Sequence, residues 1–82
     1  MTGHEFQKRR LQAHQSLQEH EGLSLTQRDL ARWFDVGKST IARLETSGDH
    51  IKRVYALALL RLQAYPEEYV TWRESQRFEP AW

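Results

Sequence analysis

The sequence predicts an all-α domain, and three observations carry this prediction. Apolar residues recur at the three- and four-residue spacing of amphipathic helices along most of the chain. Residues that cap or end helices stand where these patterns begin and end. The chain has 82 residues and no Cys, so neither a disulfide framework nor a thiolate metal site is available. We therefore expect one small helical domain over residues 1–82.

The first expected helix runs from Glu5 to about Glu21. Thr2 is placed to cap its start, with Glu5 three residues later as in a capping box. Gly22 accepts the left-handed backbone angles that often end a helix. One face of this helix carries Phe6, Arg10, Ala13, Leu17 and His20.

Two short helical patterns follow, at Gln27–Phe34 and Lys38–Glu45, on either side of the segment Asp35-Val36-Gly37. Thr26 is a suitable N-cap for the first of them. Asp and Gly tolerate the left-handed angles that a tight turn between helices usually needs. The pattern predicts a helix-turn-helix unit over about residues 26–45, whose second helix enters the DNA major groove.

The joint spacing of several residues in this unit resembles the XRE family of phage and bacterial repressors, which includes the lambdoid repressors and Cro proteins. The matching positions are Thr26-Gln27, Leu30-Ala31, Val36, Ile41 and Leu44-Glu45. The resemblance implies a five-helix, all-α, lambda-repressor-like domain with this unit as its second and third helices. The sequence departs from the family at Asp35, where a turn glycine is usual. It departs again where the family's Glu-x-Gly is stretched to Glu45-Thr46-Ser47-Gly48.

Polar side chains occupy the outward face of the segment 38–45, where a DNA groove would lie. Arg43 can offer two donors to guanine O6 and N7, and Lys38 can do so less rigidly. The resemblance places the base-reading residues at Lys38, Ser39 and Arg43. Gln27 begins the preceding helix, so its side chain and backbone N–H are placed to contact a phosphate. The predicted DNA-binding residues are Gln27, Arg28, Lys38, Ser39, Thr40 and Arg43. The competing interpretation is a solvent-exposed helix with a few charges.

Trp33 is expected on the outer side of the segment 27–34. Packing against the first helix is favoured over stacking on bases, because a protein that binds duplex DNA seldom stacks on them.

Residues 51–64 are the most apolar segment and carry two stripes at helical spacing. The first stripe contains Ile51, Val54, Tyr55, Ala58 and Leu62, and the second contains Leu57, Leu60 and Ala64. A surface helix needs only one apolar face, so we expect the second stripe to be covered by the C-terminal segment or a second subunit. Asp49 is expected to cap this helix.

Pro66 is expected to start a last helix, with Glu67 and Glu68 in its favourable first turn. The helix and tail over residues 66–82 supply further apolar surface that could serve dimerisation. The predicted dimer interface contains Leu57, Leu60, Ala64, Tyr69, Trp72 and Trp82.

The distribution of charge favours local attraction to DNA. The net charge of the chain is only +1. Residues 38–53 carry a net +2 and residues 66–82 a net −2. A basic face with an acidic segment elsewhere suits a DNA-binding protein, although ordinary solvated charges would give a similar pattern.

Several other classes of function find no support in the sequence. No apolar run is long enough to span a membrane, and the N-terminus lacks a signal-peptide pattern, so a cytoplasmic protein is expected. Gly37-Lys38-Ser39-Thr40 matches only the end of a phosphate-binding loop, because Arg32 stands where the full pattern needs Gly. The four His show no metal-ligand spacing. We expect no enzymatic activity, metal or cofactor.

The main hypothesis is a sequence-specific transcriptional repressor that binds double-stranded DNA as a homodimer at an inverted-repeat operator. Many proteins that resemble this family are phage or plasmid regulators that bind their own promoter, so an autorepressor is expected. The rival hypothesis is an antitoxin or other protein-interaction module that uses the acidic and aromatic C-terminal segment, with DNA binding secondary. A nonspecific architectural protein is disfavoured by the small net charge, because such binding depends on many phosphate contacts.

Overall fold

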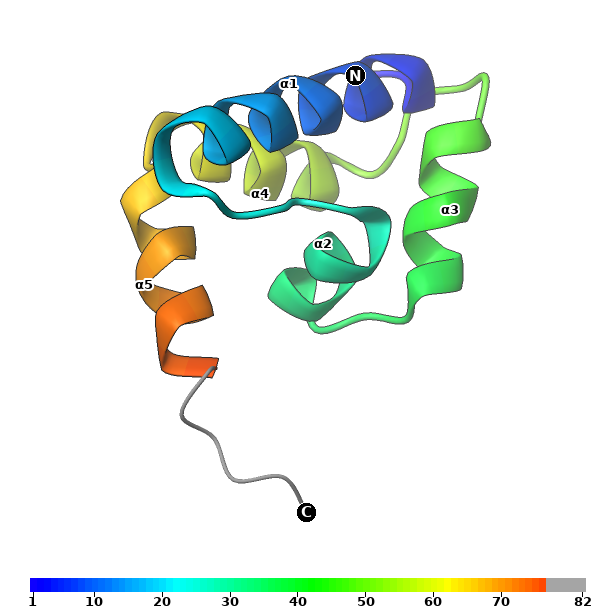
Figure 1. The fold of residues 1–82 in the computed structure, drawn as a ribbon. Helices are drawn as coiled ribbons and strands as arrows, with labels where there is room; N and C mark the ends of the chain where they lie inside the picture. The colour runs from blue at the N-terminus through cyan, green and yellow to red at the C-terminus, as the bar shows by residue number, and fades with distance from the viewer. Residues whose placement is uncertain (77–82) are drawn as a thin grey trace.

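Five helices and no strand are present in residues 1–76, which are the residues that the computed structural model describes. The helices are α1 (Gly3–Glu21), α2 (Gln27–Phe34), α3 (Lys38–Thr46), α4 (Arg53–Ala64) and α5 (Pro66–Gln76). Helix α1 crosses the top of the molecule, α3 stands at one end and α5 at the other (Figure 1). The all-α class and the five helices predicted from the sequence are confirmed.

Thr2 and Gly22 bound α1 as the sequence predicts, although the helix begins at Gly3, two residues before the predicted start. The Oγ1 of Thr2 accepts a hydrogen bond from the backbone N–H of Glu5 at 3.2 Å. Gly22 ends the helix with φ 65°, in the left-handed region. Phe6, Ala13 and Leu17 are buried. His20 was predicted on the same face but is exposed, with Nδ1 2.9 Å from the carbonyl oxygen of Ser16.

The core lies where the five helices and the segment between α1 and α2 converge. Its fully buried side chains include Phe6, Leu25, Leu30, Ile41, Leu59 and Tyr69. The ring of Phe34 connects two helices across this core, 6.3 Å from the ring of Phe6 and 6.1 Å from that of Tyr55. Burial of each large apolar side chain contributes about 1.5–3 kcal/mol.

Helix α4 differs from the prediction in its first residue and in the face that it buries. It starts at Arg53 after Lys52, with no side-chain cap, so the prediction that Asp49 caps it is wrong. Its buried residues are Ala56, Leu59 and Leu62, whereas Val54 of the predicted inner stripe is 65% exposed. Because almost every position from 54 to 62 is apolar, the sequence pattern alone does not fix which face turns inward.

Helix α5 packs against α2 through aromatic rings. The ring of Trp33 lies 5.6 Å from that of Tyr69 and 5.3 Å from that of Trp72. The ring contacts of Trp33 are therefore with α5, whereas the prediction placed it against α1. Tyr69 is fully buried, and its hydroxyl donates to the carbonyl oxygen of Ser24 at 2.7 Å. None of the helices in residues 1–76 is both long and apolar enough to cross a membrane.

Candidate nucleic-acid interface

A three-residue turn joins α2 to α3. Asp35 takes the left-handed conformation with φ 58°, and its N–H donates to the carbonyl oxygen of Arg32 at 3.1 Å. The N–H of Val36 donates to the carbonyl oxygen of Ala31 at 2.9 Å. Gly37 is extended, with φ −76°, and precedes the first residue of α3. Asp35 thus supplies the left-handed residue of the turn, which Asp tolerates better than most side chains do.

A buried polar network holds α1, α2 and α3 together at this end of the molecule. Arg10 of α1 and Glu45 of α3 are 7% and 2% exposed. The Nε and Nη2 of Arg10 donate to the two carboxylate oxygens of Glu45, the second at 3.1 Å, and its Nη1 donates to the carbonyl oxygen of Leu25. The Nε2 of Gln27 also donates to Glu45, at 2.8 Å. This network fixes the start of α2 relative to α3.

The first turn of α2 is closed by a capping box. Thr26 Oγ1 accepts from the N–H of Asp29 at 3.2 Å, and Asp29 Oδ2 accepts from the N–H of Thr26 at 3.0 Å. Ser24 Oγ donates to the same carboxylate at 2.6 Å, and Arg73 of α5 binds its other oxygen. Burial alone would raise the pKa of Asp29, but the hydrogen bonds from Ser24, Thr26 and Arg73 outweigh burial and lower the pKa to about 2.

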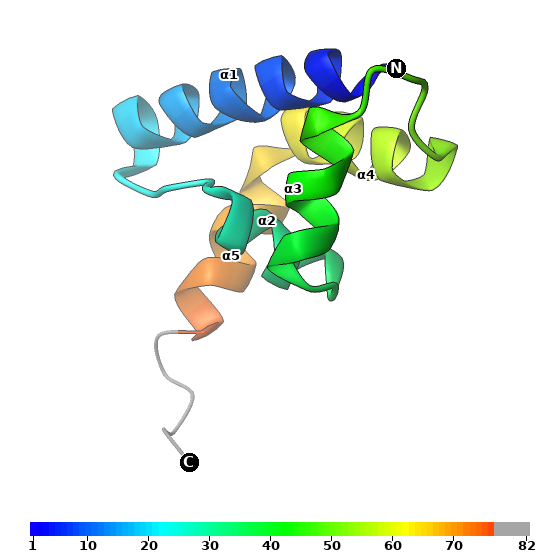
Figure 2. The ribbon, with the colours of Figure 1, turned by 90° about the vertical axis from the view of Figure 1, so that its right-hand side faces the viewer.

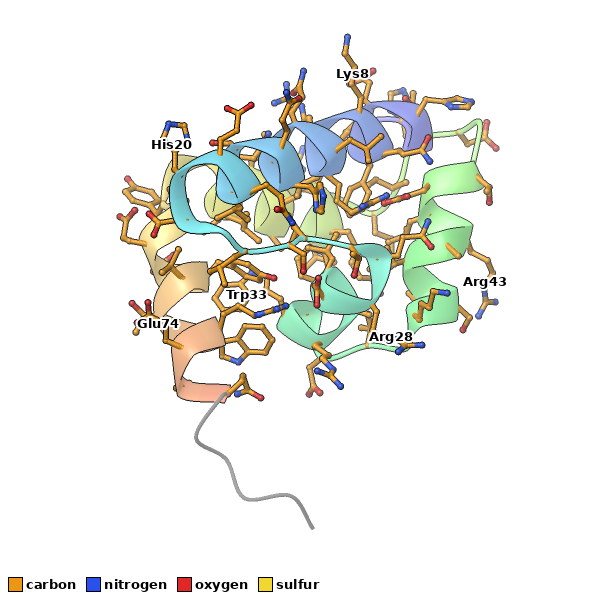
Figure 3. All side chains as sticks on the ribbon, in the orientation of Figure 1. Lys8, His20, Arg28, Trp33, Arg43 and Glu74 are labelled. Atoms are coloured by element: carbon orange, nitrogen blue, oxygen red, sulfur yellow. The ribbon has the colours of Figure 1, made fainter. Side chains whose placement is uncertain are left out.

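The outer face of α3 is polar and free of the core. Lys38, Ser39 and Arg43 are exposed, whereas Ile41 and Glu45 on the opposite face are buried. Figure 2 shows α3 in front of the remaining helices, with its long side open to the viewer. Arg43 and Arg28 lie on the side of the molecule that α3 forms, while Lys8 and His20 project from α1 (Figure 3).

Two open grooves flank α3. The first, of about 530 Å³, lies between α1 and the starts of α2 and α3, and Gln27, Arg28 and Lys38 line it. The second, of about 430 Å³, lies between α3 and the start of α4, and Thr40 and Arg43 line it. Of the six residues predicted to bind DNA, these five divide between the two grooves, and Ser39 is exposed at the start of α3 between the lysine and Thr40.

The grooves contain cationic or titratable residues that the sequence did not assign to the site. Arg10 and His14 line the first groove, and His50 and Lys52 line the second. The N–H of Leu25 donates to His14 Nδ1 at 2.9 Å, so the proton of the neutral ring lies on Nε2. One signal was available for Arg10, because an arginine on an apolar helix face needs a buried partner.

The residues predicted to form a dimer interface do not all remain at the surface. Leu57 and Leu60 are 56% and 37% exposed, and Ala64 is exposed as well. Tyr69 has no exposed surface and Trp72 is half-buried against Trp33, so the chain's own core occupies these two aromatic side chains. Trp82 lies outside the described residues.

Within residues 1–76, no three His, Cys, Asp or Glu side chains gather as the ligands of a metal ion would. Comparison of the chain with protein-family models, curated proteins and solved structures finds no match to any of the three.

Proposed function

We propose that this protein is a DNA-binding transcriptional repressor of the helix-turn-helix type, which acts as a homodimer on an inverted-repeat operator. The observation that carries the proposal is the division of α3 into two faces. Ile41 and Glu45 anchor the helix in the protein, and Lys38, Ser39 and Arg43 are exposed on the other side. Such a helix can enter a groove without losing its packing.

The dimensions and donors of α3 suit the major groove. Nine residues make a helix of about 13 Å, and the groove is about 12 Å wide. Arg43 can donate to O6 and N7 of a guanine, and Lys38 and Ser39 can contact neighbouring bases. Each good bidentate contact contributes about 1–3 kcal/mol of discrimination between bases.

Donors to phosphate flank α3 on both sides, as a helix between two DNA strands requires. Among the described residues, Asp29 and Leu30 of α2 donate their N–H groups to Thr26, which leaves those of Gln27 and Arg28 for a phosphate. Lys52 and His50 lie along the other groove, where the opposite strand would pass. One amide hydrogen of Gln27 is already bound to Glu45, so its backbone N–H becomes the more important contact.

The exposed apolar face of α4 supports a second copy of the chain as partner. Val54, Leu57 and Leu60 are exposed on this helix, and Tyr65 continues the surface at its end. Clustered exposed apolar side chains often mark an interaction site. A single recognition helix covers only a few base pairs, and two-fold symmetry is the usual way to lengthen the site.

The alternative of a protein-interaction module rests on the same face of α4. The aromatic residues Tyr69 and Trp72, on which the sequence-based alternative relied, are packed against Trp33. A foreign partner would therefore have to use Val54, Leu57 and Leu60. Co-purification of a stoichiometric second protein that is displaced by Leu57→Asp would favour this alternative.

The test is binding to the DNA upstream of the protein's own gene, with scrambled DNA of equal length and composition as the competitor. We expect binding to the upstream DNA to be at least about a thousandfold tighter at physiological salt. Lys8→Ala removes a cation from the side of α1 away from α3, so it is the matched control for Arg43→Ala. Equal affinity of the parent protein for both DNAs would exclude a specific repressor of its own gene.

A further inference from the structure

A polar network connects α5 to the first turn of α2 across a large separation in sequence. Arg73 Nη1 donates to Asp29 Oδ1 and, at 3.2 Å, to the hydroxyl oxygen of Tyr69. The Tyr69 hydroxyl in turn donates to the carbonyl oxygen of Ser24, just before α2. The Arg73 and Asp29 side chains are only 26% and 13% exposed. The pair is therefore less screened by water and salt than a surface ion pair.

The Asp29 carboxylate has two opposing effects on this end of α2. It stabilises the helix, because a negative charge near a helix N-terminus interacts favourably with the helix dipole. It also stands in the same turn as the free N–H groups of Gln27 and Arg28, where it would repel a phosphate. The pKa of Asp29, near 2, keeps this charge in place at neutral pH.

We infer that Arg73 is a positioning residue for the DNA backbone: its guanidinium neutralises Asp29 and so lets the first turn of α2 accept a phosphate. This inference rests on the proposed DNA-binding function and adds α5 to the elements that determine DNA affinity. Arg73 need not touch DNA, because it acts through Asp29.

The ion pair between Arg61 and Glu68 provides a matched control at the junction of α4 and α5. Its two nitrogen–oxygen contacts are 2.9 and 3.0 Å, so its geometry is as good as that of the inferred pair. Its side chains are 61% and 43% exposed, and neither lines a groove beside α3. Arg61→Gln removes the same charge from the chain but lies away from the first turn of α2, since Arg61 lines a pocket beside Trp33 and Phe34 at the end of that helix.

The test measures affinity for the upstream DNA as a function of salt in Arg73→Gln, Asp29→Asn, the double variant and Arg61→Gln. Without Arg73, the charge of Asp29 would repel a phosphate a few ångströms away. This repulsion is strong enough for Arg73→Gln to weaken binding roughly five- to tenfold at low salt. The loss should shrink as salt rises. The double variant should recover to within about twofold of the parent, because the amide oxygen of Asn can still accept the hydrogen bond from the N–H of Thr26 but carries no charge. Arg61→Gln should bind as the parent does.

The single variant Asp29→Asn decides between an electrostatic and a purely structural role even if Arg73→Gln folds poorly. We expect it to bind DNA at least as tightly as the parent, with a steeper salt dependence, since Arg73 is then an uncompensated cation. Weaker binding by folded Asp29→Asn, or failure of the double variant to recover, overturns the inference. A parent that does not distinguish the upstream DNA from scrambled DNA instead contradicts the proposed function.

Discussion

Arg10 of α1 and Glu45 of α3 form a buried ion pair in which two guanidinium nitrogens face both oxygens of the carboxylate. The third guanidinium nitrogen is also used, since Arg10 Nη1 donates to the carbonyl oxygen of Leu25 at 3.1 Å. A buried charge is tolerated only when its hydrogen-bonding groups are paired in this way. The pair therefore fixes the inner face of α3 while its outer face stays free.

Removal of one partner of this pair should destabilise the whole domain. Glu45→Ala leaves the Arg10 guanidinium buried without a counter-charge, at a cost of about 3–5 kcal/mol, which is a large part of the stability of a small domain. Urea unfolding followed by circular dichroism measures the change in the free energy of unfolding. Glu68→Ala, which breaks an exposed ion pair, should leave that free energy nearly unchanged. Equal stability of the two variants would contradict the buried pair.

Gly3 is required where α1 meets the end of α3. A methyl group at this position would overlap the backbone oxygens of Leu44 and Ser47. Gly3→Ala should therefore cost about 1–3 kcal/mol, as overpacking does. Gly48→Ala is the control, because a methyl group there meets no atom within 4 Å. A thermal midpoint for Gly3→Ala equal to that of the parent would show that the two helices can separate without cost.

Local features of the fold could be predicted from the sequence because their causes are local. Thr2 and Thr26 cap the helices that they precede, and Gly22 ends α1, since each motif spans only a few residues. The bounds of α2 follow from the same short-range patterns. The outward face of α3 was predictable because Ile41 and Leu44 define its inner side.

Features that depend on distant contacts could not be predicted. The partner of Trp33 is decided by how α5 packs on α2, 36 to 39 residues further along the chain. The buried face of α4 is set by contacts with α1 and α5, because an almost uniformly apolar segment has no preferred phase of its own. Arg10 and Glu45 lie 35 residues apart, so no pattern in the sequence pairs them.

Asp29 should make the stability of the domain depend on pH in the acid range. Its pKa falls from 3.8 to about 2 on folding, so the folded state holds the charged form more tightly than the unfolded state does. The stabilisation is complete above about pH 5 and is lost as the pH falls through the folded-state pKa, with a total of about 2 kcal/mol. Urea unfolding of the parent and Asp29→Asn at several pH values measures this contribution of Asp29 to the free energy of unfolding. Parallel pH profiles for the two proteins would exclude it.

Arg43 and Gln27 should differ in what their loss does to DNA binding. Arg43→Ala should lose about 1–3 kcal/mol on the specific site and much less on random DNA, because base contacts discriminate between sequences. Gln27→Ala removes only the side-chain contact and keeps the backbone N–H, so it should weaken binding to both DNAs slightly and evenly, as the loss of a phosphate contact does. It should also lower stability, because its amide donates to buried Glu45. The same ratio of specific to random affinity in both variants would contradict these roles.

The exposed face of α4 should determine the oligomeric state. Leu57 is 56% exposed, so aspartate at this position is solvated in the monomer and becomes costly only when a partner covers it. Leu57→Asp should therefore fold with an unchanged helical circular-dichroism spectrum, sediment as a monomer and bind the operator much more weakly. Leu60→Asp should behave similarly, although its lower exposure adds some cost to the monomer.

Leu11→Asp is the matched control for sedimentation, because Leu11 is 50% exposed but lies on α1. It should remain a dimer, since the proposed contact does not involve α1.

In the dimer, the two α3 helices should lie about 34 Å apart on one face of the duplex, so that half-sites one helical turn apart bind best. Insertion of about five base pairs between the half-sites should abolish tight binding, because it turns them to opposite faces of the DNA. A parent protein that is monomeric at micromolar concentration and binds its site tightly at either spacing would exclude the dimer.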